Sequence, residues 1–154
     1  MKSTAVAPTL RRTDLARSAL IAVLLIWTGM LLGVSFLAIP AQFGAPSLTR
    51  PVAFDVVRQV FGAFGRMEIA LALVSGALAL LGRAPRLIWL LLALPGLMVA
   101  VQAGWLRPAL DMRVDLILEG QTPPPASWHQ IYVVLEGLKL LGLMLTAWVA
   151  HRTG

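Results

Sequence analysis

The sequence predicts an all-α integral membrane protein that forms a bundle of four membrane-spanning helices. Four apolar segments each approach the roughly 20 residues that a helix needs to cross a hydrocarbon core of about 30 Å. Of the 154 residues, 58% are hydrophobic and only 13% are charged. Soluble domains contain about 45–50% apolar and about 25% charged residues. Lipid offers no hydrogen-bond partners to open strands, so helix is the expected backbone.

A single membrane domain is expected over residues 19–150, with polar cytoplasmic tails at 1–18 and 151–154. The expected spans are the four apolar stretches at about 19–39, 60–81, 87–106 and 128–150. The first stretch is longer than the roughly 7–15 residues of a signal-peptide core, and no clean A-x-A site follows it, so we expect a retained span. In the first outer loop, Pro40, Pro46 and Pro51 argue against one continuous helix.

The second outer loop is predicted to begin with a short amphipathic helix. Pro108 suits the first turn of such a helix. Acidic residues then recur at steps of four and share one face: Asp111, Asp115 and Glu119. Apolar residues fall on another face: Leu110, Val114 and Ile117. A helix with this pattern could rest on the membrane surface.

The basic residues predict that both ends of the chain lie in the cytoplasm. With the N-terminus inside, the inner side holds seven Lys and Arg residues: Lys2, Arg11, Arg12, Arg17, Arg83, Arg86 and Arg152. The outer side then holds four: Arg50, Arg58, Arg107 and Arg113. Cytoplasmic loops carry an excess of Lys and Arg, so this orientation is the favoured one. The expected location is the plasma membrane, crossed several times.

Four charged residues fall well within the apolar segments: Arg66, Glu68, Glu136 and Lys139. Each costs about 2.5–3.5 kcal/mol there even on the lenient insertion scale, so these side chains should face the bundle interior and pair. Glu68 and Lys139 lie at similar depths, about 14 Å and about 17 Å along their spans at 1.5 Å per residue. We predict a Glu68–Lys139 ion pair, with Glu136 reaching Arg66 or His129.

The second and fourth spans are predicted to face each other with polar stripes. In the fourth span the stripe covers roughly 80° of the helix and contains His129, Tyr132, Glu136 and Lys139. In the second span, Glu68 shares its face with small residues that let helix backbones approach closely. The first and third spans are expected to be mainly apolar walls.

Three interpretations of the polar set stay open. Two acids and two bases are neutral together, which is typical of a buried network that fixes helix register. His129, Tyr132 and Glu136 also form a ladder of titratable groups, which indicates a polar pocket open to the outer surface for a small solute, an ion or protons. The stripe could instead meet another subunit, in a homo-oligomer or a membrane complex.

The sequence contains no catalytic or cofactor motif that we recognise. The absence of cysteine excludes disulfides and Cys-ligated metals. His129 and His151 lie on opposite sides of the predicted bilayer, so they cannot share a haem. Two metal alternatives remain, copper bound by His129 with Met67 or Met112, and a hard cation bound by Asp111, Asp115 and Glu119. A solvated helix face is the favoured interpretation of these three acids. No Ser-His-Asp elbow is present, and the net charge of +6 lacks the Lys/Arg runs with interleaved aromatics typical of nucleic-acid binding.

Two short motifs resemble a known group of proteins. The first is Trp27-Thr28-Gly29 followed by Phe36, Pro40 and Phe43, which resembles the W-x-G…F…P…F pattern of small bacterial membrane proteins related to transmembrane protein 205. The second, His129-Gln130-Ile131-Tyr132 with Glu136 and Lys139, is similar to the start of the last span in that group. The resemblance covers most of the chain in span order. It implies a four-helix bundle in the bacterial plasma membrane without an established catalytic role.

The sequence therefore predicts a non-enzymatic membrane protein whose only certain partner is the lipid bilayer. Its charged network between the second and fourth spans would be structural, or the protein would be an accessory to a membrane complex. The alternative is a small transporter or a proton-coupled permeation element with its pocket at His129 and Glu136. No metal, cofactor or nucleic acid is expected.

Overall fold

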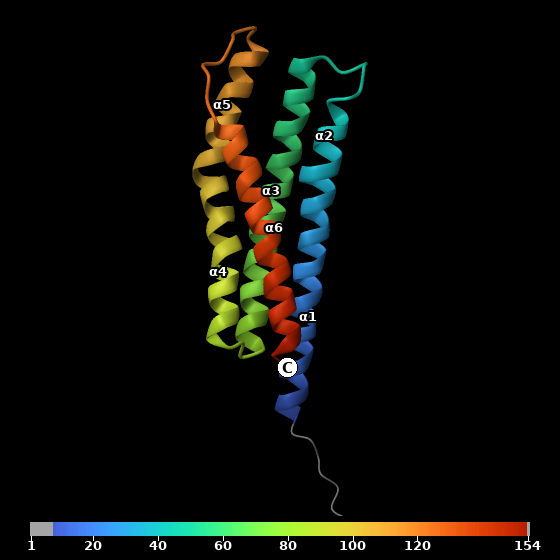
Figure 1. Ribbon diagram of the computed structural model, residues 1–154, viewed down its shortest axis with the longest axis vertical. Helices are drawn as coiled ribbons and strands as arrows, with labels where there is room; N and C mark the ends of the chain where they lie inside the picture. The colour runs from blue at the N-terminus through green and yellow to red at the C-terminus, as the bar shows by residue number, and fades with distance from the viewer. Residues whose placement is uncertain (1–7, 154) are drawn as a thin grey trace, which may run out of the picture.

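Four long helices form the part of the chain that the computed structural model describes, residues 8–153. Lys2, which entered the orientation argument, lies outside this part. Each of the four helices is long and apolar enough to cross a membrane: Arg12–Gln42, Arg50–Leu81, Arg86–Leu118 and Trp128–Arg152. They run side by side with alternating direction (Figure 1). The predicted all-α bundle with four candidate spans is confirmed.

Two of the four helices are uniform, and two change their winding part-way. The uniform ones are α3 (Arg50–Leu81) and α6 (Trp128–Arg152). The first helix consists of α1 (Pro8–Leu31), a π-helical segment η1 (Leu32–Ala38) and α2 (Ile39–Gln42). The third consists of α4 (Arg86–Val101), a π-helical segment η2 (Gln102–Leu106) and α5 (Arg107–Leu118).

A proline explains the position of each π-helical segment. Pro40 and Pro108 are each the second residue of the α-helix that follows the segment. Proline has no N–H, and within an α-helix its ring clashes with the carbonyl four residues earlier. Wider winding before the proline relieves this clash, and the hydrogen bonds there reach back five residues, from Ile39 N to Val34 O and from Arg107 N to Gln102 O. The helix therefore continues past the proline.

The helices are longer than the sequence indicated. We expected a first outer loop at 40–59, but α3 already begins at Arg50 with Pro51 in its first turn, where proline is tolerated. The connection is therefore only about 43–49. We expected the loop helix at Pro108 to be separate, whereas α5 continues the third long helix without a break. The tail at 1–18 is helical from Pro8.

The helix backbones pair around a ring, α1 with α3, α3 with α4, α4 with α6 and α6 with α1. The two helices with polar stripes, α3 and α6, therefore lie on one diagonal of the bundle. The described ends of the chain lie at the same end of the bundle as the tight α3–α4 link (Figure 1). In that link Arg83 takes a left-handed conformation with φ of 50°, as a tight turn requires.

Large apolar side chains cover the outside of the bundle. Leu73 and Leu80 are each 70% exposed, and Leu25, Leu90 and Leu141 are exposed on the other three helices. Water-soluble monomers rarely expose apolar patches of such extent. The exterior fits a lipid environment and leaves the interior as the place for polar groups.

Candidate functional site

The Lys139 side chain lies at the centre of the bundle and is fully buried. Its Nζ donates to Glu68 Oε1 at 2.6 Å and to Gln102 Oε1 at 2.7 Å. Glu136 Oε1 lies 2.7 Å from the same nitrogen. A lysine ammonium has three N–H donors, so each one has an acceptor. The hydrogen bonds and the two nearby carboxyl groups offset the cost of removing this charge from water.

Glu136 receives hydrogen bonds on both of its carboxylate oxygens. Oε1 accepts from Gln102 Nε2 at 2.8 Å in addition to Lys139. Oε2 accepts from the Ser35 hydroxyl at 2.6 Å. Three donors therefore converge on this one carboxyl group.

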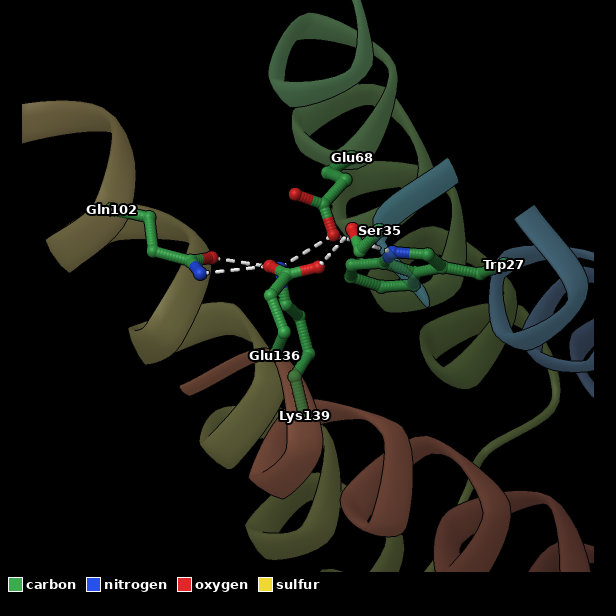
Figure 2. Close-up of polar contacts among 6 residues, drawn as sticks. All are labelled: Trp27, Ser35, Glu68, Gln102, Glu136 and Lys139. Atoms are coloured by element: carbon green, nitrogen blue, oxygen red, sulfur yellow. Dashed lines mark hydrogen bonds and ion pairs between the residues drawn. The ribbon is translucent and has the colours of Figure 1, made fainter. Parts of the chain in front are cut away.

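Glu68 is bound differently, because both of its donors reach the same oxygen. Oε1 accepts from Lys139 and from the indole Nε1 of Trp27, the latter at 3.0 Å. Figure 2 shows the second oxygen of Glu68 pointing away from the other five side chains of the network. No hydrogen bond to this second oxygen occurs among the described residues.

All four long helices supply at least one member of this network, which joins Trp27, Ser35, Glu68, Gln102, Glu136 and Lys139 (Figure 2). The two π-helical segments supply Ser35 and Gln102. A π-helical turn changes the angle between neighbouring side chains and often occurs at functional sites. The changed winding directs these two polar side chains inward from helices that are otherwise apolar.

The predicted Glu68–Lys139 ion pair is confirmed. The predicted partners of Glu136 were wrong, because neither Arg66 nor His129 reaches it. Arg66 is exposed. It precedes Glu68 by two residues, which places it about 200° around the helix at 100° per residue, so the two cannot face the same neighbour. The buried set therefore contains two acids and one base rather than two of each.

Three members of the network were not predicted: Trp27, Ser35 and Gln102. The sequence held a signal for two of them. Trp27 lies in the middle of its span rather than at an interface, and a buried indole N–H requires an acceptor. Gln102 is a polar amide in an otherwise apolar span. Nothing distinguished Ser35, because its inward direction depends on the π-helical winding.

Tyr132 and His129 line two adjoining cavities in the half of the bundle that lies away from the α3–α4 link. One measures about 410 Å³ and the other about 260 Å³. They share Ile39, Phe43, Phe61, His129 and Tyr132. The smaller cavity also touches Ser35 and Glu136, so it leads from the exposed His129 down to the network. Tyr132 is buried and packs edge-on against Phe61, with ring centroids 5.0 Å apart.

The wall of the larger cavity carries charged groups from α3 and α5. Arg58 pairs with Asp55 at 2.8 Å and also with Asp115, which ties α3 to α5. Exposed ion pairs of this kind contribute little stability. The Arg107 side chain lies against Gly65, where a Cβ would clash with the guanidinium.

The copper alternative gains no support from this geometry. Met67 and Met112 are exposed, and neither lines a cavity with His129. Among the described residues, no group of three His, Cys, Asp or Glu side chains is placed to hold a metal ion.

In comparisons with protein families, with curated proteins and with solved structures, no match to this chain was found. The resemblance to proteins related to transmembrane protein 205 therefore stays a prediction. Any function has to be argued from the polar network and from the cavities beside it.

Proposed function

We propose that this chain is a non-enzymatic multi-pass protein of the bacterial plasma membrane whose buried charged network holds its four spans together. In this role it is structural, or it is an accessory subunit of a membrane complex. The observation that carries the proposal is that one hydrogen-bonded network receives side chains from all four long helices.

The saturation of Lys139 supports a structural role. All three of its donors already have protein acceptors. A ligand could bind the ammonium only by displacing one of them. Within a membrane, apolar helix faces gain little from packing against each other rather than against lipid, so interhelical hydrogen bonds make a larger share of the association.

Replacement of Lys139 tests the structural proposal. Lys139→Gln removes the charge and leaves two buried carboxyls without their shared partner. Breaking a buried ion pair costs about 3–5 kcal/mol, so we expect a large fall in the temperature of unfolding in detergent micelles. Arg66→Gln is the matched control, because it removes a cation from the exposed side of α3. Equal small effects of both variants would contradict the proposal.

The accessory role has a separate test. The exposed apolar faces of all four helices can contact lipid or the spans of other subunits. Purification in a mild detergent from the native membrane is expected to retain a stoichiometric membrane partner or a homo-oligomer. A solitary chain under every mild condition would argue against the accessory role and leave the structural one.

A second candidate function is favoured by the smaller cavity. This cavity of about 260 Å³ joins His129 and Tyr132 at the outer side with Ser35 and Glu136 at its floor. A titratable carboxylate at the end of a cavity inside a membrane-spanning bundle is typical of proton-coupled permeation. Four spans are few for a lone carrier, so we expect such a permeation element to work as a dimer.

The second candidate predicts that the cavity-facing carboxylate is needed for flux. In proteoliposomes that contain a pH-sensitive dye, Glu136→Gln should abolish solute-driven or potential-driven proton uptake while the variant remains monodisperse and helical. Asp111→Asn, which changes an acid of the larger cavity only, is the control. Absence of uptake by the unmodified protein across a panel of small solutes would eliminate this candidate.

A further inference from the structure

The three ionisable side chains of the network do not balance in charge. Lys139 carries one positive charge, and Glu68 and Glu136 each carry one negative charge when ionised. All three are at most 2% exposed. One positive and two negative charges leave a net charge of −1 at the centre of a bundle that is apolar outside. An unbalanced charge at this depth is strongly disfavoured.

Within residues 8–153, no second cation pairs with this centre. From the first long helix come the uncharged Trp27 and Ser35, and from η2 the amide of Gln102. Tyr132 lies one turn from Glu136 on α6. Arg107 lies against Gly65, one turn from Glu68, yet among the described residues it makes no ion pair with either carboxyl group.

We propose that the network binds one proton and holds it on Glu68, so that its centre is neutral. The hydrogen bonds make this assignment. Both donors to Glu68 reach Oε1, and the carbonyl oxygen of a neutral carboxylic acid can still accept both hydrogen bonds. Among the described residues no donor reaches Oε2, so a proton on that oxygen meets no other donor. On Glu136 both oxygens already accept hydrogen bonds, so that carboxyl group stays ionised. A buried O–H costs far less than a buried net charge.

The proton site lies next to the smaller of the two cavities. Glu136 lines that cavity, and Glu136 and Glu68 share Lys139 as a partner. A proton that arrives through the cavity can therefore reach the network at Glu136. The inference rests on the contacts of the network, and it stands or falls separately from both proposed functions.

Isosteric replacement of each carboxyl group tests the assignment. Glutamine has the shape of a protonated glutamate, with a carbonyl oxygen and a donor in place of the O–H. Glu68→Gln therefore keeps both hydrogen bonds to Oε1 and should leave the unfolding temperature unchanged. Glu136→Gln puts an NH₂ group where donors from Ser35, Gln102 and Lys139 already converge. This variant should therefore have a clearly lower unfolding temperature. The opposite order, with Glu68→Gln the damaging change, would overturn the assignment to Glu68.

Infrared spectroscopy of the reconstituted protein at neutral pH detects the proton directly. A protonated carboxyl group gives a C=O band that ionised carboxylates lack. We expect this band in the unmodified protein. It should be lost in Glu68→Gln, because the remaining Glu136–Lys139 pair is neutral without an added proton. Absence of the band in the unmodified protein would overturn the proposal even if neither variant changes the stability.

The dependence of the unfolding temperature on pH gives a third test of the bound proton. If the folded state holds a proton that the unfolded chain has released at neutral pH, stability falls as the pH rises. The unfolding temperature of the unmodified protein should therefore fall on going to alkaline pH relative to that of Glu68→Gln, which has no such proton to lose. Parallel curves for the two proteins would count against the bound proton.

Discussion

At the scale of single residues, Trp27 is the largest of the fully buried side chains in the described part of the chain. Its ring belongs to the apolar core formed with Leu24, Leu31 and Leu143. Its indole N–H donates to Glu68. Trp27 thus belongs to the apolar core and to the polar network, and it joins the first long helix to α3.

Trp27→Phe separates these two roles. The phenyl ring retains most of the apolar contact, whereas the donor to Glu68 is lost. Lys139 still donates to the same oxygen, so only one of its two hydrogen bonds is lost. A single hydrogen bond contributes about 0.5–1.5 kcal/mol, so the free energy of unfolding in mixed micelles should fall by that amount. Trp89→Phe is the control, because Trp89 is 41% exposed. Equal losses in the two variants would show that ring size rather than the hydrogen bond matters.

At the scale of helices, α4 and α6 pack closely at Gly142. A Cβ built at this position would lie 3.4 Å from Leu94 Cδ2 and 3.7 Å from Pro95 Cδ. Pro95 is itself buried inside α4. Small residues at such contacts let helix backbones pack closely in membranes. The close approach brings α6 to the helix that supplies Gln102 to Lys139.

Gly142→Leu should separate the two helices. The Cβ would already contact Leu94 and Pro95, so we expect the rest of the leucine side chain to overpack this contact at a cost of about 1–3 kcal/mol. Gly137→Leu is the matched control on the same helix, since a Cβ there meets no atom within 4 Å. We expect a lower unfolding temperature for Gly142→Leu only. A neutral result at both positions would mean that α4 and α6 adjust freely.

At the scale of the whole molecule, the charge distribution of the chain predicts its orientation in the bilayer. The tight link with Arg83 and Arg86 lies at the same end of the bundle as both described chain ends (Figure 1). The two wider connections lie at the opposite end (Figure 1). The excess of Lys and Arg at the first end favours the cytoplasm for it.

Single cysteines can test this orientation, because the chain contains no cysteine of its own. Ser47 lies in the connection between the first long helix and α3, Thr153 follows the end of α6, and both residues are exposed. A membrane-impermeant maleimide added to intact cells should label Ser47→Cys at once, but Thr153→Cys only after permeabilisation. The reverse pattern would mean that both chain ends face outward.

The sequence by itself determined the class of the protein and one central contact. The number of spans follows from the length of apolar segments, which is a local property. The Glu68–Lys139 pair follows from matched depth and from the cost of leaving either charge alone, so it did not require knowledge of the packing. The starting points of the helices were less well predicted, because a proline can occupy a first turn or follow a π-helical segment without ending the helix.

Only the tertiary structure decided which polar groups complete the network. Arg66 points outward although it lies in the same span as Glu68, and Ser35 and Gln102 point inward from helices that read as apolar walls. The direction of each side chain depends on the helix phase, which the two π-helical segments change locally. The resulting surplus of one acid, which underlies the proposed proton site, appears only when the four helices are assembled.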